Sequence, residues 1–364
     1  MHNSAIDPTQ LTRALVVKLR HHGDVLLAAP VLTALRHFAP QCEVDALVYA
    51  DTAPMLSAHP HLSQLHTIDR RWKTQGIGRQ AMAEYRLLQQ LRRRKYDLAV
   101  HLSVHTRGAW LVRLLRPRWS VAPDLPHKPG KERALSFWRN SFTHLYAAQS
   151  HPDRHTVETN LDSLRVLGWT PSDEDKRVIL CAGEAAEARI EQWLAQQGLL
   201  AGRYIHLHPA SRWRFKCWPS ERVAALCDEL AQRGWPVVLS AAPDAEEMAL
   251  VRAVRSVARA PTFDLSGQLT LKELAALAAR ARLFVGVDSA PMHIAAAMGT
   301  PTVAIFGPSG DREWGPWHTA HRIVASSAHQ CRPCGRAGCN DSKVSECLTT
   351  LPVGQVLSAC LELL

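Results

Sequence analysis

Residues 284–307 read FVGVDSAPMHIAAAMGTPTVAIFG and form the clearest strand–helix–strand pattern in the chain. An apolar run stops at Asp288-Ser289, a helix of small residues is predicted from Pro291, and a second apolar, strand-like run starts at Pro301. Two strands joined by a helix are typical of a right-handed crossover in a parallel sheet. This segment therefore predicts an α/β fold in which polar residues stand where a strand passes into a helix.

Alternating strands and helices extend from this segment toward both ends of the chain. Strands are predicted at 14–19, 43–49, 66–69, 96–102, 204–208, 236–239, 283–287 and 301–306. Helices are predicted at 24–36, 80–91, 157–167, 220–233, 245–256, 271–281, 291–298 and 351–364. Residues 117–150 show no clear period, and residues 168–175 read as a polar linker. We therefore expect two Rossmann-like, doubly wound parallel-sheet domains that face one another across a cleft, at 1–170 and 171–350, with a closing helix at 351–364.

Length and composition bound the class of protein. The chain has 364 residues, of which 46% are hydrophobic and 21% charged, so it can build two ordinary cores and is neither disordered nor fibrous. Its N-terminus has no apolar stretch behind a basic start, which argues against a secretory signal. The longest apolar run, 25–35, contains a proline and is too short to cross a bilayer. These features predict a soluble intracellular protein.

Positive charge is concentrated in the first half of the chain. Residues 1–170 hold 23 Lys and Arg against 13 Asp and Glu, whereas residues 171–364 hold 20 of each. The stretch 71–140 alone has 16 basic and 4 acidic side chains. This half is either a solvated basic surface or the binding face for a polyanion: nucleic acid, acidic lipid headgroups or a phosphorylated glycan. Because no nucleic-acid-binding motif is present, nucleic acid is disfavoured.

Four of the nine cysteines lie close together in the sequence, at Cys331, Cys334, Cys339 and Cys347. Such a cluster in an intracellular protein indicates a metal or redox site, or else a cysteine-rich surface loop. Its spacing matches neither a paired CxxC zinc ribbon nor a familiar iron–sulfur pattern. The remaining five cysteines have apolar neighbours and read as buried thiols.

Three strand-to-helix junctions carry residues suited to chemistry, and the first is residues 18–24, KLRHHGD. With a single glycine it is not a GxGxxG fingerprint, so dinucleotide binding is disfavoured. It places the Asp24 carboxylate at the start of a helix. Asp24 is therefore either the N-cap of that helix or a functional carboxylate.

The other two junctions favour anion binding. Residues 208–221, HPASRWRFKCWPSE, follow a strand with a hydroxyl and several cations, which form either a diphosphate cradle or an exposed basic loop. At the third junction, backbone amides after Asp288 can meet phosphate oxygens, and its carboxylate can accept sugar hydroxyls. The alternative there is a capped helix in which His293 is a core residue.

Together the three junctions resemble the ADP-heptose:lipopolysaccharide heptosyltransferases, a family of GT-B glycosyltransferases. VDSAPMHIAAAMGTPTVAIFG is similar to the family's donor-site signature, and the HPASRWRFKCWP loop precedes it at the expected distance. KLRHHGDVLLAAPVL resembles the family's N-terminal motif. The HHGD motif and the segment CRPCGRAGCNDSKVSECL near the C-terminus are most similar to the heptosyltransferase III branch. The resemblance covers nearly the whole chain.

For the acceptor side, the resemblance implies roles in the first junction. Asp24 matches the general base that takes the proton from the acceptor hydroxyl. Lys18 matches a basic residue that either orients Asp24 or meets acceptor phosphate, and Arg20 and His22 are expected to contact the acceptor as well.

For the donor side, Ser211 and Lys216 match residues that hold the diphosphate, and Lys216 would offset charge on the departing ADP. Asp288, with the amides of Ser289 and Ala290, matches the sugar and phosphate contacts. Ala290 stands where the family often has glycine, a change that leaves the backbone amide in place.

Two further donor contacts are implied. Glu246 or Glu247 lies where the family presents a ribose-binding acid, and the sequence does not choose between them. His293 belongs to the donor-site signature and is expected to lie at the same site.

The resemblance implies an inverting, metal-independent transferase that moves L-glycero-D-manno-heptose from ADP-heptose to the inner core of lipopolysaccharide, with no cofactor. Its acceptor would be a phosphorylated lipid A bearing Kdo and heptose. The enzyme would therefore be cytoplasmic and peripheral at the inner face of the inner membrane. The alternatives are another GT-B transferase or epimerase with a different nucleotide sugar, and a non-catalytic nucleic-acid-binding protein.

Overall fold

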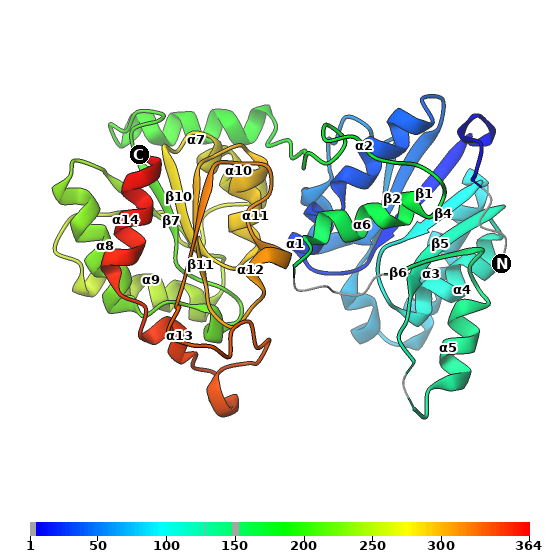
Figure 1. The fold of residues 1–364 in the computed structure, drawn as a ribbon. Helices are drawn as coiled ribbons and strands as arrows, with labels where there is room; N and C mark the ends of the chain where they lie inside the picture. The colour runs from blue at the N-terminus through cyan, green and yellow to red at the C-terminus, as the bar shows by residue number, and fades with distance from the viewer. Residues whose placement is uncertain (1–4, 128, 148–152) are drawn as a thin grey trace. The chain divides into compact units, whose positions relative to one another are not determined.

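The computed structural model describes residues 5–127, 129–147 and 153–364, which belong to two compact units that divide between Ile179 and Leu180 (Figure 1). Each unit contains a six-stranded, wholly parallel sheet with helices on both faces. The predicted fold class, two Rossmann-like domains of the GT-B type, is confirmed.

The first sheet has the strand order β3-β2-β1-β4-β5-β6. Its strands are β1 (Arg13–Lys18), β2 (Glu43–Tyr49), β3 (Gln64–Ile68), β4 (Leu98–His101), β5 (Trp119–Asp124) and β6 (His144–Ala147). The inner strands β1 and β4 are almost entirely buried, as expected for apolar strands covered on both faces. The order reverses between β1 and β4, and such a switch point is where doubly wound sheets bind ligands.

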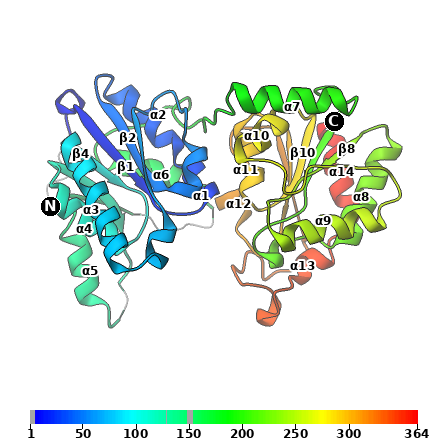
Figure 2. The same cartoon turned by 180° about the vertical axis from the view of Figure 1, so that it is seen from behind.

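Helices cover both faces of the first sheet. They are α1 (His22–Leu26), α2 (Ala29–Phe38), α3 (Ile77–Arg94), α4 (Thr106–Leu115), α5 (Glu132–Arg139) and α6 (Thr156–Arg165), with 3-10 turns η1 (Pro8–Gln10), η2 (Ala50–Met55) and η3 (Arg70–Thr74). Helices α2 and α6 pack together on one face, and α3, α4 and α5 follow one another across the other (Figure 2). The apolar sides of α3 and α4 face the sheet, where they contribute Leu87, Leu91 and Leu111 to the core.

The second sheet repeats the topology of the first. Its order is β12-β11-β10-β7-β8-β9, so the switch point lies between β7 and β10. Its strands are β7 (Ile205–His208), β8 (Val237–Leu239), β9 (Phe263–Asp264), β10 (Leu283–Val287), β11 (Thr302–Phe306) and β12 (His321–Ala325).

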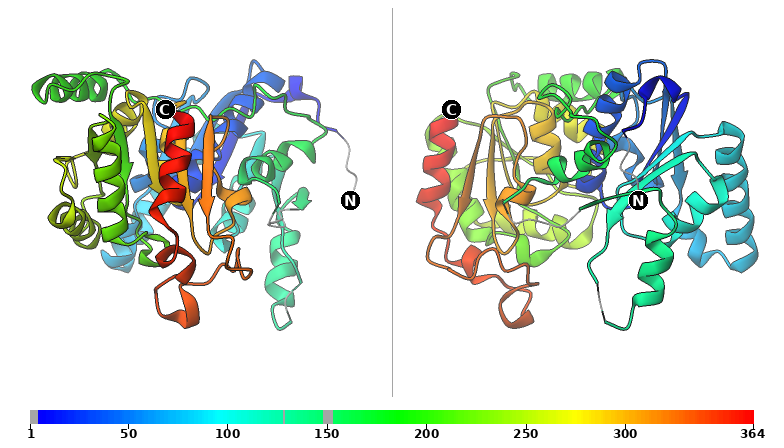
Figure 3. Two further views of the ribbon diagram at one scale, coloured as in Figure 1. Left: turned by 60° about the vertical axis from the view of Figure 1, so that its left-hand side comes forward. Right: turned by 45° about the vertical axis from the view of Figure 1, so that its right-hand side comes forward.

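Two helical layers also enclose the second sheet (Figure 3). The helices are α7 (Glu184–Gln196), α8 (Ser220–Gln232), α9 (Ala245–Val257), α10 (Leu271–Ala279), α11 (Ala290–Ala297), α12 (Asp311–Trp314), α13 (Glu346–Thr349) and α14 (Val353–Leu363), with 3-10 turns η4 (Arg214–Lys216) and η5 (Cys339–Asp341). One layer, α8, α9 and α14, shares a core with the sheet that includes Trp218 and Val356. In the other, Met292 of α11 packs with Phe284 and Phe306. Within the described ranges, no helix combines the length and apolar character needed to cross a membrane.

The structure differs from the sequence-based prediction in several elements. The helix predicted at 24–36 is two helices, because α1 ends at Leu26 and α2 begins at Ala29 with Pro30 in its first turn, where a missing N–H costs no hydrogen bond. Residues 117–150, which show no clear period, contain β5, α5 and β6. Six other helices and strands, α4, α7, α12, α13, β9 and β12, were not predicted either.

Contacts between residues far apart in the sequence determine where the two units divide. The first unit runs to Ile179, beyond the boundary predicted at 170, since Asp175 pairs with His37 and Lys176 lies 3.2 Å from Glu158. Helix α14 belongs to the second unit, because its residue Val356 lies in that unit's core.

Candidate active site

Most of the predicted site residues follow the carboxyl ends of strands that flank the two switch points, and Glu246 and Glu247 follow β8. In the first unit, Lys18 ends β1 and residues 19–24 follow it. In the second unit, Ser211 follows β7 and Asp288 follows β10, so both lie at the same edge of the sheet. This is the edge where doubly wound sheets bind ligands.

Asp24 lies in the first turn of α1 and remains accessible. Its side chain is 16% exposed, and its Oδ1 is 3.7 Å from Nε of Arg20, whose side chain is 60% exposed. Because Arg20 is exposed to solvent, an ion pair of this length contributes little to stability. The carboxylate is thus positioned by its helix and is available to accept a proton from a bound molecule.

Lys18 is buried beneath this junction. Its Nζ donates to the carbonyl oxygen of Leu102 at 3.0 Å and to Oδ1 of Asn160 at 3.0 Å. Burial lowers the pKa of Lys18 to about 8, and the nearby Asp24 carboxylate acts in the opposite direction. Of the two roles implied by the resemblance, this arrangement favours orienting Asp24 over direct contact with the acceptor.

Asn160 is a site residue that the sequence did not reveal. Besides accepting from Lys18, it donates from Nδ2 to the carbonyl oxygen of Leu27 at 2.9 Å, just after α1. It therefore links the buried ammonium group to the segment that carries Asp24. Since 142 residues separate Asn160 from Lys18, no local sequence pattern could indicate the contact.

His22 and Arg20, both predicted to bind the acceptor, differ in availability. Nε2 of His22 is 3.0 Å from the carbonyl oxygen of Asp51, which ties the start of α1 to η2. Arg70 donates to the carbonyl oxygen of Arg20 at 3.0 Å, while the guanidinium of Arg20 itself is exposed. Arg20 is therefore the better placed of the two to meet an anionic molecule.

An ion pair joins the second and third junctions. Nζ of Lys216, in η4, is 2.5 Å from Oδ2 of Asp288, and the two side chains are 21% and 6% exposed. Ser211 is buried in the same loop, and its Oγ accepts from the N–H of Trp213 at 3.3 Å. The structure thus brings together three residues that the sequence places up to 77 positions apart.

Helix α11 supplies backbone amides beside this pair. Ser289 precedes its first residue, Ala290, and the hydroxyl of Ser289 donates to the carbonyl oxygen of Val287 at 3.3 Å. The first amides of a helix have no partner within the helix, and together with its dipole they favour an anion. His293, one turn into α11, is buried in the unit.

The structure distinguishes Glu247 from Glu246. Oε2 of Glu247 accepts from the N–H of Ala242 at 3.1 Å and lies 3.9 Å from Nε2 of His208, at the end of β7. Burial raises the pKa of Glu247. Glu246 is exposed. Of these two glutamates, Glu247 is therefore the one that lies at the carboxyl edge of the second sheet.

Two buried histidines support this edge, and sequence analysis did not assign them a role. The Oγ of Ser240 is 2.7 Å from Nε2 of His206 and 2.8 Å from Nδ1 of His208. Burial lowers the pKa of each histidine to about 3, so both are neutral at pH 7. The two histidines and Ser240 form an uncharged, hydrogen-bonded group, and His208 is the member of it that lies next to Glu247.

A sheet edge with a partly buried Lys–Asp pair, helix amides and a nearby carboxylate is a site for an anionic, hydroxyl-bearing molecule. The same residues lie in the segment matched by a family model: residues 84–345 match glycosyltransferase family 9 (heptosyltransferase). The chain belongs to this family.

Individual relatives agree with the family assignment. Lipopolysaccharide heptosyltransferase 3 of Escherichia coli is 37% identical over 300 residues, which are 82% of this chain and 84% of that protein. Among solved structures, the family 9 glycosyltransferase of Veillonella parvula has a TM-score of 0.83, with 22% identity over 100% of this chain and 99% of that one. The Escherichia coli heptosyltransferase WaaC with ADP has a TM-score of 0.71, with 20% identity over 97% and 100%. These structural likenesses concern the fold.

The cysteine cluster of this heptosyltransferase family member lies in the loop that contains η5 and α13. Cys331 and Cys334 are exposed, Cys339 is half-buried, Cys347 is buried, and all are free thiols. Across residues 5–127, 129–147 and 153–364, no group of three or more His, Cys, Asp or Glu side chains is placed so that it could hold a metal ion.

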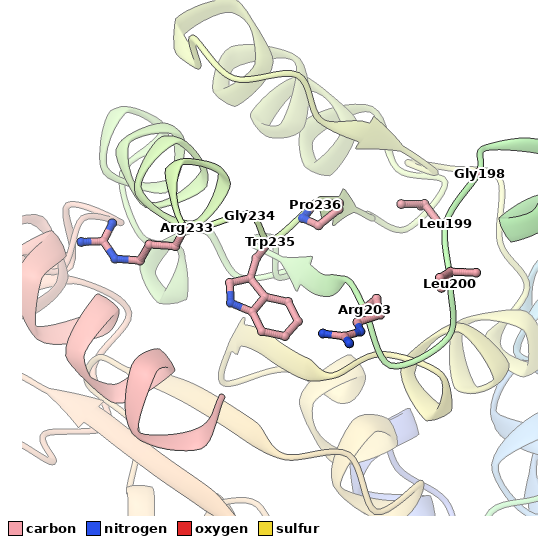
Figure 4. Close-up of a pocket in the computed structure, with 8 residues that line it drawn as sticks. All are labelled: Gly198, Leu199, Leu200, Arg203, Arg233, Gly234, Trp235 and Pro236. Atoms are coloured by element: carbon pink, nitrogen blue, oxygen red, sulfur yellow. The ribbon is translucent and has the colours of Figure 1, made fainter.

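A separate hollow of about 320 Å³ lies at the opposite edge of the second sheet (Figure 4). Leu199 and Arg203 precede β7 there, and Trp235 precedes β8. The Trp235 ring and the Arg203 side chain point into the same space, and the Arg233 guanidinium points away. Since ligands of doubly wound sheets bind at the carboxyl edge, this hollow is not part of the candidate site.

Proposed function

We propose that this family 9 glycosyltransferase transfers L-glycero-D-manno-heptose from ADP-heptose to the inner core of lipopolysaccharide, as a heptosyltransferase III. The observation that carries the proposal is the Lys216–Asp288 pair beside the first amides of α11. The names of the relatives add support, since one is lipopolysaccharide heptosyltransferase 3 and another was solved with ADP.

The proposed reaction is a single displacement. The acceptor hydroxyl oxygen attacks the anomeric carbon of the heptose, and Asp24 takes the proton of that hydroxyl. The bond from the anomeric carbon to the β-phosphate oxygen breaks, and ADP leaves with the bonding electrons. Attack opposite the leaving group inverts the configuration of the anomeric carbon.

The second unit would hold the donor. Lys216 and the amides of Ser289 and Ala290 would stabilise the diphosphate and the charge that grows on it, which is why we propose a metal-independent reaction. Asp288 would accept hydrogen bonds from hydroxyl groups of the sugar. The Ser211 hydroxyl would donate a hydrogen bond to the diphosphate.

The first unit would hold the acceptor. Arg20 is the exposed cation next to Asp24 and suits a phosphate or carboxylate of a phosphorylated lipid A that bears Kdo and heptose. With such an acceptor, the proposed location is cytoplasmic, peripheral at the inner face of the inner membrane.

The donor is tested by calorimetric titration of the purified protein with ADP, UDP and GDP, with and without chelator. We expect ADP to bind at least about tenfold more tightly than the other two, with no effect of chelator. A preference for UDP, or a requirement for metal, would contradict the proposed donor chemistry and favour another nucleotide sugar. Failure to bind any of the three would indicate a relative without transferase activity.

Glu247→Gln is expected to lower ADP affinity by about tenfold, because a buried charged partner for the ribose hydroxyls is worth roughly 1.5 kcal/mol. Glu246→Gln is the matched control, since Glu246 is exposed one position away, and its ADP affinity should stay near that of the wild type. Both are measured by titration with ADP. If Glu246→Gln alone weakens binding, the ribose assignment to Glu247 is wrong.

A further inference from the structure

Exposed apolar side chains are concentrated on one side of the first unit. Of the eleven large apolar side chains that are exposed in the described part of the chain, six lie within residues 77–114. These six, which we call the apolar patch, are Ile77, Met82, Tyr85, Val104, Trp110 and Leu114. They lie on or beside α3 and α4 (Figure 2).

The helices that carry the patch lie side by side, in the order α3, α4 and α5. Glu84 of α3 lies 2.9 Å from Arg107 of α4, which places the middle of one helix beside the start of the other. Trp110 of α4 packs against Phe137 of α5, with ring centroids 5.0 Å apart. The guanidinium of Arg113 lies 4.5 Å from the same Phe137 ring.

Other side chains of α3 and α4 form the contacts with the core. Helices α3 and α4 already turn Leu87, Leu91 and Leu111 toward the sheet. An outward face of such a helix is normally polar, yet Tyr85 and Trp110 are 58% and 57% exposed.

Exposed cations lie on α3, the same helix as Ile77, Met82 and Tyr85 of the apolar patch. Arg79, Arg86 and Arg93 are exposed on α3, and in the described ranges none of them forms an ion pair. Tryptophan and tyrosine interleaved with arginine are typical of protein faces that lie in the headgroup layer of a bilayer.

The patch extends to the edge of the sheet that carries Asp24. Helices α3 and α4 each follow a strand, so their first residues stand at the carboxyl edge of the first sheet. Ile77 and Met82 are in the first turns of α3, and Val104 lies two residues before α4.

We propose that the apolar patch and its arginines dock the first unit on an anionic lipid bilayer. The aromatic side chains lie among the headgroups, and the arginines pair with lipid phosphates. The inference deepens the proposed function, on which it rests, because it names the face through which a lipid-borne acceptor reaches the edge that carries Asp24.

A second copy of the chain fits this surface less well than a bilayer. A twofold interface would bring the same surface of both copies together. Arg79, Arg86 and Arg93, which are exposed on α3, would then face the same positive charges on the second copy, which is unfavourable.

The test is cosedimentation of the full chain with vesicles of phosphatidylcholine alone and of phosphatidylcholine with phosphatidylglycerol. We expect binding to the anionic vesicles at least about tenfold stronger than to the neutral ones, and weaker binding as salt is raised. Two variants, Tyr85→Ser/Trp110→Ser and Arg79→Glu/Arg86→Glu/Arg93→Glu, should each lower anionic vesicle binding by about tenfold or more.

Matched controls come from exposed residues of the second unit. Leu200→Ser/Val257→Ser removes exposed apolar side chains, and Arg203→Glu/Arg252→Glu/Arg259→Glu reverses the same number of charges. Both controls should bind anionic vesicles like the wild type. Thermal unfolding and titration with ADP check that every variant is folded.

Three results would overturn the proposal: no binding of the wild type to anionic vesicles, unchanged binding of both patch variants, or a dimer in light scattering that Tyr85→Ser/Trp110→Ser converts to monomer. Retention of nucleic acid that the arginine variant abolishes, without vesicle binding, would assign the surface to nucleic acid instead. Turnover with an acceptor fragment that lacks acyl chains separates this inference from the proposed function. If vesicle binding behaves as expected but no heptose is transferred, the proposed function fails and the docking surface stands.

Discussion

Asp24→Asn is expected to lower turnover by about 10²–10⁴-fold, because an amide of the same shape cannot take the proton from the acceptor hydroxyl. ADP affinity should change by less than about twofold, since Asp24 belongs to the first unit and the proposed nucleotide contacts belong to the second. The measurement is steady-state transfer from ADP-heptose to the lipid acceptor, together with titration of the variant with ADP.

Asp51→Asn is the matched control for this variant. Asp51 is a nearby carboxylate whose side chain is 48% exposed and pairs with Arg70 at 3.2 Å. Loss of such a surface pair should leave turnover close to that of the wild type. Near-normal turnover of Asp24→Asn would show that the base lies elsewhere.

Lys216→Ala is expected to lower turnover by about 10²–10³-fold and to weaken ADP binding as well. The variant removes a positive charge from the proposed diphosphate site. It also leaves the buried Asp288 carboxylate without its partner 2.5 Å away, so a negative charge would face the phosphates. Both effects act on the departing ADP and on bound ADP, unlike the effect of Asp24→Asn.

Arg252→Ala provides the control for removal of a cation, because Arg252 is exposed on α9. Its turnover and ADP affinity should match the wild type. Thermal unfolding of Lys216→Ala separates weaker binding from loss of the fold. If Lys216→Ala is folded and binds ADP as the wild type does, Lys216 does not hold the diphosphate.

The parts of the molecule that the sequence predicted well depend on local patterns. The run from β10 through α11 to β11 combines apolar strands, a proline in the first turn of the helix and small helical residues, all within 24 positions. The 117–150 region lacked such a pattern. There β5 ends in Pro123-Asp124, and the ring nitrogen of Trp138 in α5 donates to the carbonyl oxygen of Pro123, so packing stabilises what local sequence does not indicate.

The sequence by itself determined the α/β class, the family resemblance and the identity of Asp24, Lys216 and Asp288 as candidates, because each depends on residues close together in the chain. Only the tertiary structure decided that Lys18 is buried against Leu102 and Asn160, and that Glu247 rather than Glu246 faces the end of β7. Only the structure, too, decided that Tyr85 and Trp110 are left outside the core. Burial depends on contacts between residues far apart in the chain, and a linear pattern does not record them.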